Sequence, residues 1–352
     1  MIITVTLNLA LDVTYQVPAV DWDGVNRVSA VHRRAGGKGV NVARVLAALG
    51  RDVLVTGLAG GPTGQAIEAD LRAAGLPSAL YAIAGDSRTT LAVSDLPPTR
   101  GTPAHTASAP AAAPPGTPAQ AAPPRDVPPP DVPPPGAPAQ AAAGARRTAL
   151  FNEPGPEVTA AELAGFVRHY TTLLTTGGVG AVVLSGSLPR GVPADTYATL
   201  AAIAADHGVP SIVDADGAPL RHAPQGRPSI LKPNADELAR AVPGGGTPAE
   251  GAQALRGQGA GAVVVSLGAD GLLAVTGEGT FAARMPYTVR GNPTGAGDSL
   301  VAGLALGLVE PGAWPDMLKR AAALGAAAVA TPVAGEIDPD VYADIHPQII
   351  IT

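Results

Sequence analysis

The residues with the clearest chemical potential form a run of glycines and small side chains that leads into an apolar segment near the C-terminus. The run reads Pro293-Thr294-Gly295-Ala296-Gly297-Asp298-Ser299, followed by Leu300, Val301, Leu304 and Leu308. Glycines just before a helix leave backbone N–H groups accessible, and the helix dipole adds positive potential, so the run predicts a phosphate cradle. Asp298 could accept the proton of a hydroxyl that attacks a cradled phosphoryl group. Alternatively, Asp298 only complements the dipole of an ordinary helix start.

A second glycine turn, at 35–43, also opens a segment with helical periodicity. It differs from a Walker A loop, because Gly39 follows Lys38 and because His32 stands where a glycine would be required. Lys38 as a compact charge and Asn41 as a donor and acceptor suit a polyhydroxylated, phosphorylated ligand. The alternative is a hairpin-to-helix turn with a solvated lysine.

A third motif, Lys232-Pro233-Asn234-Ala235-Asp236-Glu237, follows a predicted strand at 229–231. Asn234 and Glu237 are three residues apart on a helix and could hold the hydrated Mg²⁺ that phosphoryl transfer requires. The alternative is a capping box with Asn234 as N-cap. Weaker signals at 185–189 and 266–271 follow strands, where open α/β sheets place ligands. The six histidines show no metal-ligand spacing.

These motifs need a scaffold, and the apolar pattern predicts an α/β fold. Runs rich in Val and Ile alternate with segments of helical period, as in strand–helix–strand units on a mostly parallel sheet. A capping box of Thr159 and Glu162 starts one of the predicted helices. The predicted buried strands are 2–7, 52–58, 180–184, 210–214 and 261–266.

Two pairs of short alternating runs lack intervening helices and predict a small antiparallel sheet that acts as a lid. They are 13–17 with 27–34, and 89–94 with 147–152. Between the second pair, residues 97–147 hold 16 of the 37 prolines and have no Leu, Ile, Met or aromatic residue. A segment of this composition predicts an extended, disordered insert at 97–145. We therefore expect one domain over 1–352, with lid strands near 13–34, 87–95 and 146–153.

Composition excludes several classes of function. The net charge is −6, without a dense cluster of Lys and Arg, which argues against a nucleic-acid surface. The absence of cysteine excludes disulfides and thiolate sites. The N-terminus carries no Lys or Arg before Arg27 and predicts a first strand, and the apolar stretch 321–335 is too short to cross a bilayer. We expect a cytoplasmic protein without a membrane span.

In this order, the motifs resemble the ribokinase/PfkB-type carbohydrate kinases, most closely the hexose-phosphate branch of 1-phosphofructokinases and tagatose-6-phosphate kinases. The resemblance rests on N-L-A-L-D at 8–12, G-V-N-R at 24–27, A-G-G-K-G-V-N-V-A-R-V-L at 35–46, S-R-T at 87–89, F-N-E-P-G-P at 151–156, S-G-S-L-P at 185–189, K-P-N-A-D-E-L at 232–238 and N-P-T-G-A-G-D-S at 292–299. It implies a ribokinase-like three-layer fold with a β-lid, which often pairs with a second subunit, so a homodimer is expected.

The resemblance also implies roles for single residues. Asp298 would be the catalytic base, and Gly295, Ala296 and Gly297 the anion hole. Asp12, Gly37 and Asn41 would bind sugar hydroxyls, while Lys38 and Arg88, with Arg27 as a third candidate, would hold the phosphate already on the sugar. Asn234 and Glu237 would organise Mg²⁺ and ATP, and Lys232, Ser266 and Gly268 would lie by the nucleotide.

The implied activity is ATP-dependent phosphorylation of D-fructose 1-phosphate at C6. Its nearest rival is tagatose-6-phosphate kinase, since both substrates are ketohexose phosphates. A third reading is a non-catalytic sugar-phosphate sensor or scaffold. The sequence departs from the branch at Leu9, Thr90 and Arg190, and Asn292-Pro293 replaces the acidic residue common in ribokinases.

Overall fold

The computed structural model describes residues 1–18, 20–21, 23–95, 148–310 and 312–352. The predicted insert at 97–145 lies outside these ranges. The described chain divides into two compact units. The first contains Met1–Val13, His32–Leu91 and Phe151–Thr352, and the second contains Thr14–Val31 and Ala92–Leu150.

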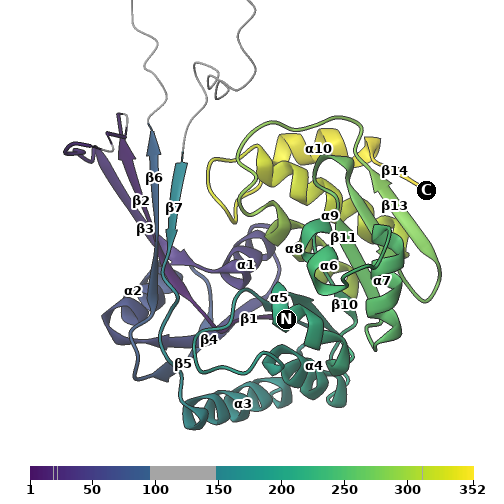
Figure 1. Cartoon of the computed structure of the whole chain (residues 1–352), viewed down its shortest axis with the longest axis horizontal. Helices are drawn as coiled ribbons and strands as arrows, with labels where there is room; N and C mark the ends of the chain where they lie inside the picture. Colours follow the sequence, from purple (N-terminus) through teal and green to yellow (C-terminus); the bar gives the residue numbers. More distant parts are fainter. Residues whose placement is uncertain (19, 22, 96–147, 311) are drawn as a thin grey trace, which may run out of the picture. The chain divides into compact units, whose positions relative to one another are not determined.

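Ten strands of the described ranges form the main sheet, which belongs to the first unit (Figure 1). In spatial order they are β14 (Ile350–Ile351), β13 (Thr280–Arg284), β12 (Leu272–Val275), β11 (Ala262–Ser266), β10 (Ile230–Leu231), β9 (Ser211–Asp214), β8 (Ala181–Ser185), β1 (Ile2–Thr6), β4 (Val53–Gly60) and β5 (Ser78–Ile83). The seven strands from β11 to β5 pair in parallel, while β12, β13 and β14 extend the sheet in antiparallel pairing. The predicted mostly parallel sheet is confirmed.

Helices cover both faces of this sheet, because its buried strands are apolar on both sides. In β1, for example, Ile2 packs into one core while Ile3 and Val5 pack into the other. One core is covered by α1 (Lys38–Ala48), α2 (Gly61–Ala73), α8 (Ala296–Val309), α9 (Trp314–Val329) and α10 (Pro339–Gln348). The other is covered by α3 (Ala160–Thr175), α4 (Thr196–Asp206), α6 (Ala235–Ala241) and α7 (Pro248–Gly257), with α5 (Gly217–His222) and the short 3₁₀ helices η1 (Ala223–Gly226) and η2 (Gly268–Asp270) nearby. The three-layer α/β fold is confirmed.

Local signals explain where the helices begin. The Thr159 hydroxyl accepts a hydrogen bond from the Glu162 N–H, and the Glu162 carboxylate accepts one from the Thr159 N–H, so the predicted capping box starts α3. Helix α1 begins at Lys38 after Gly37, which has a φ of 117° that favours glycine. No helix in the described ranges is long and apolar enough to span a membrane.

A second sheet of the described residues has four strands, in the order β3 (Ala30–Gly36), β2 (Ala10–Val17), β6 (Arg88–Asp95) and β7 (Thr148–Asn152). These strands overlap the segments predicted near 13–34, 87–95 and 146–153. Their action as a lid and their pairing with a second copy stay predictions.

Candidate active site

The sequence motifs meet in the first unit because they follow neighbouring strands of the main sheet. Strands β1, β8, β9, β10 and β11 lie side by side in parallel, so their carboxyl ends share one edge. Asn8, Gly186 and Lys232 come just after β1, β8 and β10, and Asp214 ends β9. Such an edge is where open α/β sheets bind their ligands.

The predicted phosphate cradle forms the start of α8. Gly295 is the N-cap residue, with a φ of 87°, and an added Cβ would lie 2.8 Å from the Ala334 Cβ. Any other residue would therefore be strained and crowded at this position. Gly295 lets the chain turn into α8, whose first-turn N–H groups have no acceptor within the helix itself. Of the predicted anion hole, the Ala296 N–H is already used, because it donates to the Pro293 carbonyl over 3.2 Å.

Asp298 lies in the first turn of α8 and is only 6% exposed. Asn41, from α1, donates a hydrogen bond from Nδ2 to Asp298 Oδ2 over 2.8 Å. This bond fixes one carboxylate oxygen, so Oδ1 is the oxygen available to accept a proton. The structure brings the predicted base and a predicted sugar-binding residue together across 257 positions of the chain.

Burial raises the pKa of Asp298 to about 7. This net pKa also includes a rise from the negative charge of Asp214 and a lowering by the bond from Asn41 and by the charges of Lys38 and Lys232. A carboxylate whose pKa lies near neutrality is suited to accept a proton at neutral pH and to release it afterwards.

This pKa predicts the pH dependence of the reaction. Asp298 must be unprotonated to act as a base, so kcat/KM is expected to fall about tenfold for each pH unit below about 7 and to level off above it. Steady-state kinetics from about pH 5 to about pH 9 would measure this limb. A decrease of kcat/KM centred near the ordinary pKa of an aspartate would contradict the assignment of Asp298 as the base.

A buried carboxylate that the sequence analysis did not single out lies beside this base. Asp214 Oδ1 accepts bonds from Lys38 Nζ over 3.2 Å and from Lys232 Nζ over 3.3 Å, and Oδ2 lies 3.3 Å from the Ser185 hydroxyl. Burial alone would raise the pKa of Asp214, but Lys232 and Lys38 outweigh it and hold this pKa low. Asp214 therefore stays charged between two ammonium groups.

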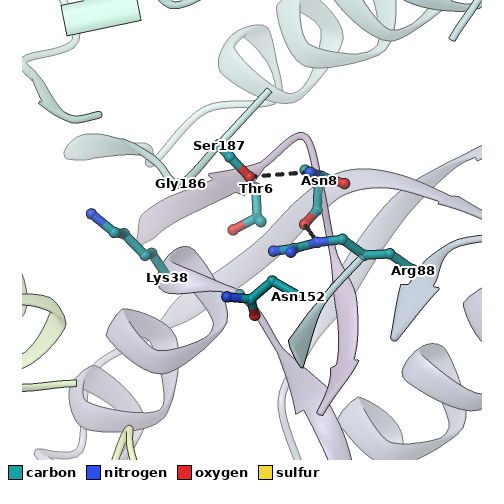
Figure 2. A pocket seen from close by; sticks show the side chains of 8 residues that line it. Thr6, Asn8, Lys38, Arg88, Asn152, Gly186 and Ser187 are labelled. Carbon is teal, nitrogen blue, oxygen red and sulfur yellow. Dashed lines mark hydrogen bonds between the residues drawn. The ribbon is translucent and has the colours of Figure 1, made fainter. Parts of the chain in front are cut away.

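A cavity of about 360 Å³ opens at the same edge of the sheet (Figure 2). Arg88 and Lys38 line it together with Thr6, Asn8, Gly37, Asn152, Gly186 and Ser187. None of the described residues that line it is acidic. The cavity is therefore suited to an anionic ligand with hydroxyl groups.

Hydrogen bonds hold two sides of this cavity in place. Arg88 donates from Nε to the Asn8 carbonyl over 3.2 Å and from an Nη to the Glu153 carbonyl over 3.3 Å. Asn8 donates from Nδ2 to the Ser187 hydroxyl over 3.1 Å. Two donors of the guanidinium are thus used for orientation, and its remaining donors are left for a ligand.

Asp12 lies close to Arg88 and is partly buried. Burial raises its pKa to about 6, although Arg88, Arg34, the Thr90 hydroxyl and Arg44 each lower it. A Cβ on Gly36 would lie 2.0 Å from Asp12 Oδ2, so only glycine leaves room for the carboxylate. The structure therefore places Asp12, a predicted sugar-binding residue, where it interacts electrostatically with the Arg88 guanidinium.

Asn234 and Glu237 form the capping box that the sequence analysis weighed as the alternative. Asn234 Oδ1 accepts from the Glu237 N–H over 2.8 Å, and Glu237 Oε2 accepts from the Asn234 N–H over 2.7 Å. Ser266 pairs with Asn234 in an isolated parallel bridge, and Gly268 begins η2 beyond it. The residues predicted for the nucleotide thus lie together after β10 and β11.

The donor set at this place fits Mg²⁺ held through water. Glu237 Oε1 is outside the capping box and offers a carboxylate oxygen, and Mg²⁺ in kinases usually keeps waters and uses one or two carboxylates plus substrate phosphates. Within the described residues, no group of three or more His, Cys, Asp or Glu side chains could hold a metal.

The sequence analysis did not single out several residues of the site, and one residue that it did predict, Arg27, belongs to the second unit. Thr6, Asn8, Asn152 and Ser187 line the cavity, although only the motifs around them had been noted. Asp214 was seen only as the end of a predicted strand, and that position was the one available signal. Arg27 is exposed and belongs to the second unit, so its predicted contact with the sugar phosphate stays a prediction.

Comparisons with known proteins agree with this fold. The model of the pfkB family of carbohydrate kinases matches residues 6–114 and 160–340. The structure is similar to phosphofructokinase-2 from Escherichia coli in complex with potassium, at 27% identity over 99% of this chain and 98% of that one, with a TM-score of 0.78. It is also similar to a possible 1-phosphofructokinase from Thermotoga maritima, at 23% identity over 100% and 98% of the two chains (TM-score 0.77). Arabidopsis thaliana ribokinase, complexed with ribose and ATP, matches at 18% identity over 98% of each chain (TM-score 0.63).

A glycine turn at a helix start, a buried carboxylate in the first turn of that helix and a cationic cavity on an α/β sheet suit the chemistry of a small-molecule kinase. The chain belongs to the pfkB family of carbohydrate kinases. It is an ATP-dependent sugar kinase that is similar to the phosphofructokinases within that family.

Proposed function

We propose that this kinase transfers the γ-phosphoryl group of ATP to the C6 hydroxyl of D-fructose 1-phosphate, giving fructose 1,6-bisphosphate. The observation that carries the proposal is the cavity lined by Arg88 and Lys38, without an acidic residue among its described lining, in which the charge of Lys38 also acts on Asp298. A sugar that already bears a phosphate complements the Arg88 guanidinium better than a neutral sugar does.

The residues of the site have distinct tasks in this reaction. The sugar oxygen attacks the γ-phosphorus, and its proton passes to Asp298 Oδ1. As the new O–P bond forms, the bond between the γ-phosphorus and the bridging oxygen breaks, and its electron pair leaves with ADP. The N–H groups of Gly295 and Gly297 would stabilise the charge on the transferring group, because they are oriented before the reaction begins.

The sugar would be held by Asp12, Gly37 and Asn41 through its hydroxyl groups, and by Arg88 through its phosphate. The nucleotide would lie near Lys232, Asn234, Ser266 and Gly268, at the ends of β10 and β11. Glu237 and Asn234 would hold Mg²⁺ through water, and this ion would supply positive charge to the ATP phosphates.

The experiment that tests this function is an assay of ADP release with a panel of sugars. Fructose 1-phosphate is expected to give the highest kcat/KM, ahead of fructose 6-phosphate and tagatose 6-phosphate, with unphosphorylated sugars far behind. A preference for tagatose 6-phosphate would favour the nearest alternative. Fructose 6-phosphate is the ligand in one structure of the Escherichia coli phosphofructokinase-2, which makes it a necessary comparison. Binding without turnover would favour a non-catalytic sensor.

A further inference from the structure

Lysine is rare in this protein, and its few positions are informative. The chain has 23 basic residues, of which only Lys38, Lys232 and Lys319 are lysines. Two of these three share a single carboxylate oxygen, Oδ1 of the buried Asp214. The third, Lys319, donates to the Pro347 carbonyl on the surface. The other 20 basic residues of the chain are arginines, so two lysines that share one buried carboxylate are a distinctive feature of this site.

The two ammonium groups reach different parts of the site. Lys38 lines the cavity, and its side chain is 38% exposed. The side chain of Lys232 is 4% exposed, and its Nζ would lie 3.7 Å from a Cβ added at Gly297, within the phosphate cradle. Through Asp214, the pair therefore links the cavity to the start of α8.

The position of Lys38 differs from that of Arg88. Figure 2 shows the Lys38 side chain pointing away from Arg88, across the cavity from it. Its ammonium group is held toward Asp214, whereas Arg88 is held by the Asn8 and Glu153 carbonyls. The two cationic groups are therefore held by different partners and in different orientations.

We propose that Asp214 is a positioning residue that gathers the Lys38 and Lys232 ammonium groups into a clamp for the transferring phosphoryl group. The proposal rests on the kinase function and moves Lys38 from the sugar's own phosphate to the phosphate in transfer. Asp214 offsets the repulsion between the two cations, which would otherwise not share a buried place. The clamp keeps one positive charge in excess, and this charge meets the negative oxygens of the phosphoryl group along its path.

The geometry explains why arginine does not serve here. A guanidinium is planar and favours a two-pronged contact with both oxygens of a carboxylate. Two compact ammonium groups can share Asp214 Oδ1, while Oδ2 faces the Ser185 hydroxyl. A guanidinium in place of Lys38 or Lys232 would compete for both oxygens and displace its neighbour.

The test compares Lys38→Arg, Lys232→Arg and the surface control Lys319→Arg, all of which keep the charge. With the best sugar phosphate of the panel, Lys38→Arg and Lys232→Arg are expected to lower kcat about tenfold or more. KM for the sugar phosphate should change by less than about threefold in Lys38→Arg, and Lys319→Arg should match the unmodified protein in both constants. Full activity in Lys38→Arg, or a raised KM with unchanged kcat, would overturn the clamp.

Asp214→Asn tests the positioning residue, because asparagine keeps an acceptor oxygen but removes the charge. It should lower kcat and weaken binding of ADP with aluminium fluoride and sugar phosphate, a mimic of the phosphoryl group in transfer, while ADP alone binds as before. Retained affinity for the mimic in a folded variant would overturn the proposal. If this buried variant does not fold, the Lys38 variants decide the question, since that side chain is partly exposed. Absence of turnover by the unmodified protein with every sugar phosphate would instead refute the proposed function.

Discussion

Replacement of Asp298 by asparagine is expected to lower kcat by about 10²–10⁴-fold, the usual contribution of a positioned proton acceptor. The variant should fold, because asparagine is of similar size and its oxygen can still accept the hydrogen bond from Asn41 Nδ2. It should also bind ATP with little change, since the N–H groups of the cradle belong to the backbone. What it loses is the oxygen that takes the proton of the sugar hydroxyl.

The measurements are steady-state kinetics, the thermal midpoint and ATP binding by calorimetry. Asp340→Asn is a matched control, because Asp340 is an exposed acidic residue in the first turn of another helix, α10. The residual activity of Asp298→Asn should also lack the acid limb near pH 7. Turnover within a few-fold of the unmodified protein would show that the base lies elsewhere.

Replacement of Arg88 by alanine is expected to raise KM for the sugar phosphate by roughly 10- to 150-fold, because a hydrogen bond to a charged group contributes about 1.5–3 kcal/mol. KM for ATP should stay nearly unchanged, since Arg88 lies in the cavity and is held by Asn8 and Glu153, away from the strands that carry the nucleotide motifs. This pattern is the opposite of the one expected for Lys38→Arg.

Kinetics with each substrate varied in turn would measure this split between the two KM values. Arg72→Ala is a suitable control, because Arg72 is an exposed residue of α2 that pairs only loosely with Glu68 over 3.5 Å. A rise in KM for ATP instead of the sugar phosphate would mean that Arg88 binds the other phosphate group.

Much of the fold was predictable because it depends on local patterns. A few neighbouring residues are enough to specify each of three features: the apolar runs of buried parallel strands, the capping box at Thr159 and the glycine turn before α8. The cradle, Asp298 and Lys38 could be proposed for the same reason: their residue types and local spacing limit the chemistry they can perform. The role of Arg88 was proposed from the resemblance to a known family.

Local sequence patterns left other features of the site undecided. Asn234 and Glu237 fit a capping box and a metal site equally well in sequence, and the structure shows the capping box. Asp214 belongs to none of the motifs that the sequence analysis noted. An aspartate at the end of a strand is common, so its position alone does not mark it as part of a site.

By itself, the sequence determined the α/β class of this protein, since the class follows from local backbone and side-chain preferences, and its ordered motifs indicated a carbohydrate kinase through their resemblance to that family. Only the tertiary structure decided that Lys38 meets Asp214 across 176 positions and that Asn41 meets Asp298 across 257. The physical reason is that parallel strands bring their carboxyl ends to one edge of the sheet, where burial and paired charges set the pKa of the base and the orientation of its neighbours.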